Sequence, residues 1–248
     1  MSKKADNFYG DLAGVIFYMD EIKSIKEKIL KAFSAGRCPI CMMLQQDEVD
    51  GLCYWVGQSA EKYKDSEEKI KLITSGGFCN YHFWEFQRLN TNYGSAVIGV
   101  KLIERLIKIF QTHSYKNLID AFRQRREDFK IWFFESSTHC PLCRILKKKE
   151  KMYLKELKVI LQDDVYKAKY AEGYGLCIPH FIKIIDCIED DSLLKFLFET
   201  ELAQMEKIKA SAINLIQKKE PPLCWEQTED EKKSYFRAIE KIVGRSGA

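Results

Sequence analysis

The sequence predicts an all-α protein built as a duplicated helical bundle. Apolar residues recur every three or four positions along almost the whole chain, and the period-2 alternation typical of β-strands is nearly absent. Two short motifs rich in cysteine and histidine each occur twice, which indicates two similar halves. We therefore expect two pseudo-symmetric lobes, each with a Cys3His centre.

The helices are expected in the following order. A first helix runs from about Asp11 to Ala35 and ends at Gly36, a residue suited to a helix C-terminus. Cys38-Pro39 opens the second helix, because proline is favoured in a first helical turn. Further helices are expected at 65–74, from Cys79, along the apolar stripes 97–110 and 118–133, from Cys140, from Cys177, along 194–215, and from the capping box at Thr228–Glu231 to Gly244. Asp163-Asp164 and Asp190-Asp191 have the character of helix N-terminal caps.

The repeat is the main organisational feature. Both copies read Cys-Pro-[Ile/Leu]-Cys, a spacer, and then Gly-[Phe/Leu]-Cys-x-x-His-Phe. The copies are offset by 102 residues at the first motif and by 98 at the second. The predicted layout is an N-terminal helix (1–36), a first repeat (37–112), a connecting helix (113–138), a second repeat (139–218) and a C-terminal linker and helix (219–248).

Within each copy, the two motifs supply a set of metal ligands. The first set is Cys38, Cys41, Cys79 and His82, and the second is Cys140, Cys143, Cys177 and His180. Side chains at positions i and i+3 of a helix face the same way, so two helix starts brought together place three sulfurs and one imidazole around one point. This tetrahedral set suits Zn²⁺, and the N–H groups at helix starts favour the thiolate form. We expect two structural zinc ions per chain, because four protein ligands leave no open position for hydrolytic catalysis.

Two alternatives to zinc remain open from the sequence. Thiolates, with histidine in place of some of them, also hold iron–sulfur clusters, which would suit electron transfer or redox sensing. Cys-Pro-x-Cys also occurs as a redox dithiol in glutaredoxin-like proteins, but those place it after a strand, and no strand pattern precedes Cys38 or Cys140.

The remaining candidate residues receive simpler interpretations. Glu48 and Glu150 match in the two copies, each seven residues after the second cysteine. They are too far for the same ion, so we expect surface carboxylates, with orientation of a ligand histidine as the alternative. The other thiols and histidines are expected in core, surface or helix-end positions; these residues are Cys53, Cys187, Cys224, His113 and His139.

Composition limits the class of protein. The net charge is only +4, from 40 basic and 36 acidic residues, without the basic excess of a nucleic-acid binder. No export signal and no membrane-length apolar run is evident, so we expect a cytoplasmic protein, in which nine cysteines favour metal binding or thiol chemistry over disulfides. No phosphate-binding loop or catalytic triad is present, and we expect a scaffold or interaction protein with a protein partner; homo-oligomerisation stays open.

The motifs resemble those of a family of uncharacterised prokaryotic proteins. The resemblance rests on Cys38, Pro39, Cys41, Gly77, Cys79, His82 and Trp84, on their looser repetition at Cys140, Cys143, Gly175, Cys177 and His180, and on segments 94–98 and 231–244. It covers most of the chain, although Ile182 stands where the first copy has Trp84. It implies a duplicated helical metal-binding protein and adds no reaction.

Overall fold

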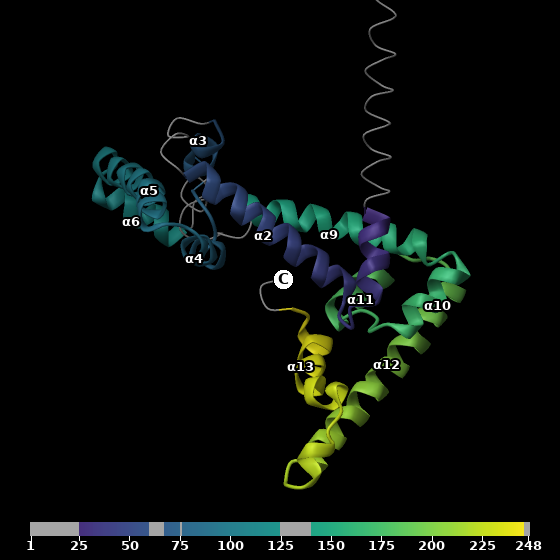
Figure 1. The fold of residues 1–248 in the computed structure, drawn as a ribbon. Coiled ribbons are helices and arrows are strands. Elements are labelled where there is room, and N and C mark those ends of the chain that lie inside the picture. The colour runs from purple at the N-terminus through teal and green to yellow at the C-terminus, as the bar shows by residue number, and fades with distance from the viewer. Residues whose placement is uncertain (1–24, 60–66, 75, 125–139, 246–248) are drawn as a thin grey trace, which may run out of the picture. The chain divides into compact units, whose positions relative to one another are not determined.

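A computed structural model describes residues 25–59, 67–74, 76–124 and 140–245, and in these ranges the chain is helical with no strand (Figure 1). The prediction of an all-α fold is confirmed, whereas the pseudo-two-fold relation between the lobes stays a prediction. The helices are 25–33, α2 (Pro39–Ser59), α3 (Glu67–Thr74), α4 (Asn80–Leu89), α5 (Asn92–Thr112), α6 (Tyr115–Gln124), α9 (Pro141–Ile160), α10 (Asp164–Glu172), α11 (Ile178–Ile185), α12 (Asp191–Gln217), the 3₁₀ turn η2 (Leu223–Glu226) and α13 (Glu229–Val243). Predicted helical positions in 11–24, 65–66 and 125–133 lie outside the described residues.

Residues that the sequence marks as helix starts and ends cap the observed helices. Thr228 caps α13, its Oγ1 accepting a hydrogen bond from the Glu231 N–H, while the Glu231 carboxylate accepts one from the Thr228 N–H. Asp163 and Asp190 cap α10 and α12 by accepting hydrogen bonds from backbone N–H groups of the first turn. Gly244 ends α13 at φ +75°, a conformation that favours glycine.

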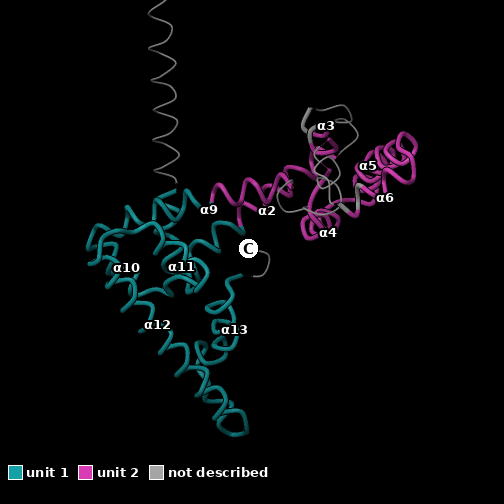
Figure 2. The backbone as a smooth tube through the Cα atoms, turned by 180° about the vertical axis from the view of Figure 1, so that it is seen from behind, with its two compact units in different colours: residues 1–45, 150–248 teal, residues 46–149 magenta. Residues whose placement is uncertain are grey.

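The chain forms two compact units, coloured separately in Figure 2. Unit 1 comprises residues 1–45 and 150–248, and unit 2 comprises residues 46–149. Both α2 and α9 therefore begin in one unit and end in the other.

The core of unit 2 is aromatic and is centred on Phe78, the residue before Cys79. The Phe78 ring lies 5.8 Å from Trp55 and 5.3 Å from Phe86, measured between ring centroids. Such aromatic pairs add specific geometry to apolar burial. Gly77 turns the chain into this core at φ +85°, and a Cβ at that position would lie 3.2 Å from Leu102 Cδ1. The Gly-Phe step thus fixes the backbone that presents Cys79.

Unit 1 holds the equivalent step with a buried charge. The Glu201 carboxylate is 1% exposed and accepts hydrogen bonds from the Tyr170 hydroxyl and from the Leu176 N–H, the latter at 2.7 Å. Lys241, also buried, forms an ion pair with Glu201 and donates to the Tyr174 carbonyl at 3.2 Å. Because a buried carboxylate is stable only when its partners are in place, this network holds the segment that leads into Cys177.

Helix α13 packs with its polar side inward. Its buried residues are Glu231, Ser234, Glu240 and Lys241, and Glu240 forms an ion pair with Arg37. The apolar residues that mark this helix in the sequence, among them Phe236 and Ile239, are instead about half exposed. On α12 the inner face is mixed, because Glu201 and Gln204 are buried together with Leu193 and Leu197 while Leu202 is exposed. Apolar periodicity therefore locates both helices but does not identify their buried polar residues.

We predict that Gly175→Ala destabilises the protein by about 1–3 kcal/mol. Gly175 has φ +74°, and a Cβ there would lie 2.5 Å from Glu201 Oε1, which cannot withdraw without losing its buried partners. Urea unfolding followed by circular dichroism measures the change. Gly57→Ala is the control, because Gly57 lies within α2 with no atom within 4 Å of its added Cβ; it should be neutral or stabilising. Equal effects of the two changes would contradict this account.

Candidate metal centres

All four ligand motifs lie at helix starts. Cys38, Cys79, Cys140 and Cys177 directly precede α2, α4, α9 and α11. Each of these cysteine carbonyls accepts the first helical hydrogen bond, from the N–H four residues later, at 2.8–3.1 Å. The second donor of each motif follows three residues after the first and faces the same side. Every motif therefore presents its donors at the positive end of a helix dipole, where thiolates are favoured.

The first cluster lies in unit 1 and consists of Cys38, Cys41, Cys177 and His180. The His180 Nδ1 atom lies 3.1 Å from Cys177 Sγ, 3.4 Å from Cys41 Sγ and 3.5 Å from Cys38 Sγ. The sulfurs of Cys41 and Cys177 are 3.7 Å apart. All four side chains are buried.

The second cluster lies in unit 2 and consists of Cys79, His82, Cys140 and Cys143. His82 Nδ1 lies 3.2 Å from Cys79 Sγ, 3.3 Å from Cys143 Sγ and 3.4 Å from Cys140 Sγ. The sulfurs of Cys79 and Cys143 are 3.7 Å apart. Cys143 is partly exposed and the other three side chains are buried.

The predicted pairing of motifs is wrong, although the eight residues are the predicted ones. The sequence predicted that Cys38 and Cys41 meet Cys79 and His82; in the structure each Cys-Pro-x-Cys meets the Cys-x-x-His of the other copy. Helix length is the physical reason. Helix α2 has 21 residues and carries the chain about 30 Å, at 1.5 Å per residue, before α4 begins. The nearest motif along the chain is therefore not the nearest in space.

The expectation of surface positions for Glu48 and Glu150 is also corrected. Glu150 Oε1 lies 3.0 Å from His180 Nε2, and Glu48 Oε1 lies 3.3 Å from His82 Nε2. Their side chains are only 16% and 12% exposed. In each cluster the imidazole thus turns Nδ1 toward the sulfurs and Nε2 toward a carboxylate, the orientation found for histidine ligands of metals.

In the second cluster without a cation, the close contacts between the donor groups shift their pKa values in opposite directions. Hydrogen bonding from the Cys143 thiol lowers the pKa of Cys140 to about 3, against the opposing effect of burial. The same contact, together with burial, raises the pKa of Cys143 far above its usual range. Burial lowers the pKa of His82, but contacts with Cys140 and Glu48 outweigh it and raise that pKa to about 10. These directions favour a thiolate at Cys140 beside a protonated His82 and a neutral Cys143.

The first cluster behaves in the same way. Hydrogen bonds from Cys38 and Cys41 lower the pKa of Cys177 to about 4, whereas burial raises the pKa of Cys38 well above its usual range. A hydrogen bond with His180, reinforced by Lys183, lowers the pKa of Glu150 to about 2 against the effect of burial. Since metal ligands must be deprotonated, a cation at either cluster would displace the protons that these groups share.

The donor set fits a single tetrahedral ion. With metal–sulfur bonds of about 2.3 Å and metal–nitrogen bonds of about 2.0 Å, the edges of a tetrahedron are about 3.8 Å between sulfurs and about 3.5 Å from sulfur to nitrogen. The observed sulfur-to-nitrogen separations are 3.1–3.5 Å, one sulfur pair in each cluster is 3.7 Å apart, and all donor atoms of a cluster lie within 4.8 Å of one another. All nine cysteines are free, so the clusters are not disulfides. Both clusters can hold metal ions.

The other sequence candidates lie apart from the clusters. Cys53 and Cys187 are exposed and Cys224 is partly exposed. His113 is the C-cap residue of α5, as expected for a polar helix-end side chain. His139 lies outside the described residues. Lys241 and Glu201 were missed by sequence reasoning, because a charged residue on a helix gives no local sign that it is buried when its partner is distant in the sequence.

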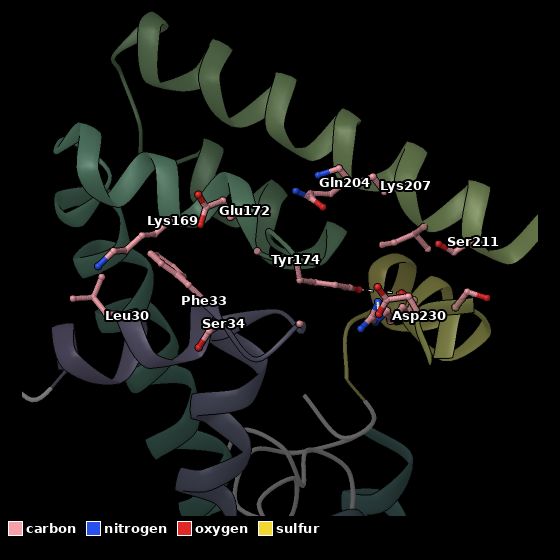
Figure 3. Close-up of a pocket in the computed structure, with 15 residues that line it drawn as sticks. Leu30, Phe33, Ser34, Lys169, Glu172, Tyr174, Gln204, Lys207, Ser211 and Asp230 are labelled. Carbon is pink, nitrogen blue, oxygen red and sulfur yellow. Dashed lines mark hydrogen bonds and ion pairs between the residues drawn. The ribbon is translucent and has the colours of Figure 1, made fainter. Parts of the chain in front are cut away.

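Unit 1 also contains a pocket of about 520 Å³ (Figure 3). It is bordered by Gly36 and Tyr174, which lie on the segments leading into Cys38 and Cys177. Lys169 and Lys207 lie in the same lining as Glu172 and Asp230, and Arg237 forms an ion pair with Asp230. Charges of both signs around one opening give no preference for a class of ligand.

Fold and site together define an all-helical protein with two buried Cys3His-type clusters that can bind metal. A family model matches residues 20–248, and the chain belongs to that family, DUF6062, a family of unknown function. Comparisons with curated proteins and with solved structures found no match. Among the described residues, no helix has the length and apolar character needed to span a membrane.

We predict that Cys79→Ser exposes Cys140 and Cys143 to alkylation while Cys38 and Cys41 stay much better protected than that pair. Loss of one donor opens the cluster to which it belongs, and that cluster contains the second Cys-Pro-x-Cys. Labelling with N-ethylmaleimide followed by peptide mass spectrometry measures each site. Cys53→Ser, which removes an exposed thiol, is the control and should change neither pair. Reactive Cys38 and Cys41 in the Cys79→Ser protein would instead support pairing within each copy.

Proposed function

We propose that the protein is a zinc-stabilised helical scaffold that binds one structural Zn²⁺ ion in each Cys3His cluster. The ligands would be Cys38, Cys41, Cys177 and His180 in unit 1, and Cys79, His82, Cys140 and Cys143 in unit 2. Four protein donors complete a tetrahedral shell and leave no position for a reacting water, so the role proposed for the metal is structural.

The compactness of the donor sets carries this proposal. In each cluster all four donor atoms lie within 4.8 Å of one another. An iron–sulfur cluster attaches its protein ligands to different irons with sulfides between them, so ligand atoms on different irons are more widely spaced than around one ion. These short separations favour a single ion such as Zn²⁺, and an iron–sulfur cluster is the second candidate. A thiol oxidoreductase is less favoured, because a redox dithiol has to be reached by its substrate, and Cys38 and Cys41 are buried.

We also propose that the scaffold serves a protein partner in a reducing compartment. Exposed apolar side chains occur on α13, among them Ile239 at 58% and Ile242 at 66% exposure, and such residues favour protein contacts over nucleic acid. The free state of all nine cysteines fits a reducing environment.

We predict that the purified protein contains about two zinc ions per chain and that Cys79→Ser lowers this to about one. The Cys79→Ser protein should also unfold at lower temperature, because bound metal adds its binding free energy to the folded state. Metal content is measured by inductively coupled plasma mass spectrometry on protein prepared without added metal, in parallel aerobically and anaerobically.

Cys187→Ser, which removes a thiol outside both clusters, should retain two ions. If the anaerobically prepared protein is brown and contains iron and acid-labile sulfide, the zinc proposal is wrong and the iron–sulfur alternative is supported. Metal-free protein whose Cys38 and Cys41 reduce disulfides would instead favour the oxidoreductase.

A further inference from the structure

The two clusters are linked through the helices that begin at them. Helix α2 starts at the first cluster with Cys38 and Cys41, yet its Glu48 contacts His82 of the second cluster. Helix α9 starts at the second cluster with Cys140 and Cys143, yet its Glu150 contacts His180 of the first. Each helix thus supplies thiols to one cluster and a carboxylate to the histidine of the other.

Helix geometry makes the two contributions of each helix inseparable. Seven residues correspond to about two turns at 3.6 residues per turn, so Cys41 and Glu48 project from the same face of α2. The same spacing separates Cys143 from Glu150 on α9. A rotation of either helix about its axis that misplaces the thiol also misplaces the carboxylate.

The carboxylates have a defined task at the histidines. A neutral imidazole that binds a cation through Nδ1 carries its proton on Nε2. Glu150 is placed to accept that proton in a hydrogen bond from His180, and Glu48 Oε1 faces His82 Nε2 at 3.3 Å. Lys183 donates to Glu150 at 2.6 Å and fixes it further. Partners of this kind change metal affinity by about 10- to 100-fold when they are removed.

We propose that Glu48 and Glu150 are positioning residues for the metal-binding histidines, and that through α2 and α9 they couple the two clusters so that loading one raises the affinity of the other. The proposal rests on metal binding at both clusters, as proposed above. Metal at the first cluster fixes the start of α2 and with it Glu48 at His82; metal at the second fixes the start of α9 and with it Glu150 at His180.

The test is a double-mutant cycle with Co²⁺ as the probe, followed by its thiolate absorption in competition with a chelator. The affinity of the second cluster is measured in the wild type, in Cys177→Ser, in Glu48→Gln and in the double variant. Cys177→Ser disables the first cluster without altering α2 or α9. We expect Cys177→Ser to lower the affinity of the second cluster by about 5-fold or more. Glu48→Gln should lower it by about 10- to 100-fold, and the double variant should lose clearly less than the product of the two effects.

Asp50→Asn is the matched control, because Asp50 is exposed on the same helix and its carboxylate accepts a hydrogen bond from the Gln46 side chain, away from both clusters. It should leave Co²⁺ affinity at both clusters unchanged. An unchanged second cluster in Cys177→Ser would overturn the coupling, and an unchanged one in Glu48→Gln would overturn the positioning role.

Native mass spectrometry of the wild-type protein during Co²⁺ titration is a second test. It uses no variant, so its result does not depend on whether the variants fold. Coupling of about 5-fold lowers the share of molecules with one ion at half saturation to about a third or less, whereas independent equal clusters would place about half of the molecules in that state. Two bound ions with the independent distribution would overturn the inference alone. A wild-type protein that binds no Co²⁺ would overturn the proposed function as well.

Discussion

In each cluster, three thiols and one imidazole lie within 4.8 Å of one another in a largely buried place. The rest of the structure depends on this close approach. Without a cation these groups share protons, because like charges so close together cannot all ionise. Helix starts supply N–H groups around the sulfurs, and carboxylates hold the far nitrogen of each imidazole. The cluster therefore fixes the relative positions of the helix starts that meet at it, and it does so more precisely than apolar packing alone would.

The two units support the same motif by different means. In unit 2 the residue before Cys79 is Phe78, which is held in an aromatic core with Trp55 and Phe86. In unit 1 the equivalent Leu176 is held through its backbone N–H by the buried carboxylate of Glu201, which Lys241 neutralises. One support depends on shape and the other on charge, so conditions that weaken ion pairs affect unit 1 more directly than unit 2.

Sequence reasoning identified the helices and the eight donor residues, because helix caps, glycines and i, i+3 spacing are local properties. It did not identify the pairing of the motifs, which depends on where a helix such as α2 delivers the chain. Glu48 and Glu150 were matched between copies, but only tertiary contact shows that each lies against the histidine of its own copy. The buried polar residues of α12 and α13 were also missed, because periodicity counts apolar residues and cannot detect a buried charge whose partner is distant in sequence.

The exchanged pairing also sets the order in which the clusters can close as the chain is made from its N-terminus. All four donors of the second cluster lie between Cys79 and Cys143, so this cluster can close first. Cys41 is separated from His180 by 139 residues, and its cluster stays incomplete until most of the chain has been synthesised. The thiols that are synthesised first are therefore buried last. Throughout translation they depend on the reducing power of their surroundings to stay in the thiol form that the cluster requires.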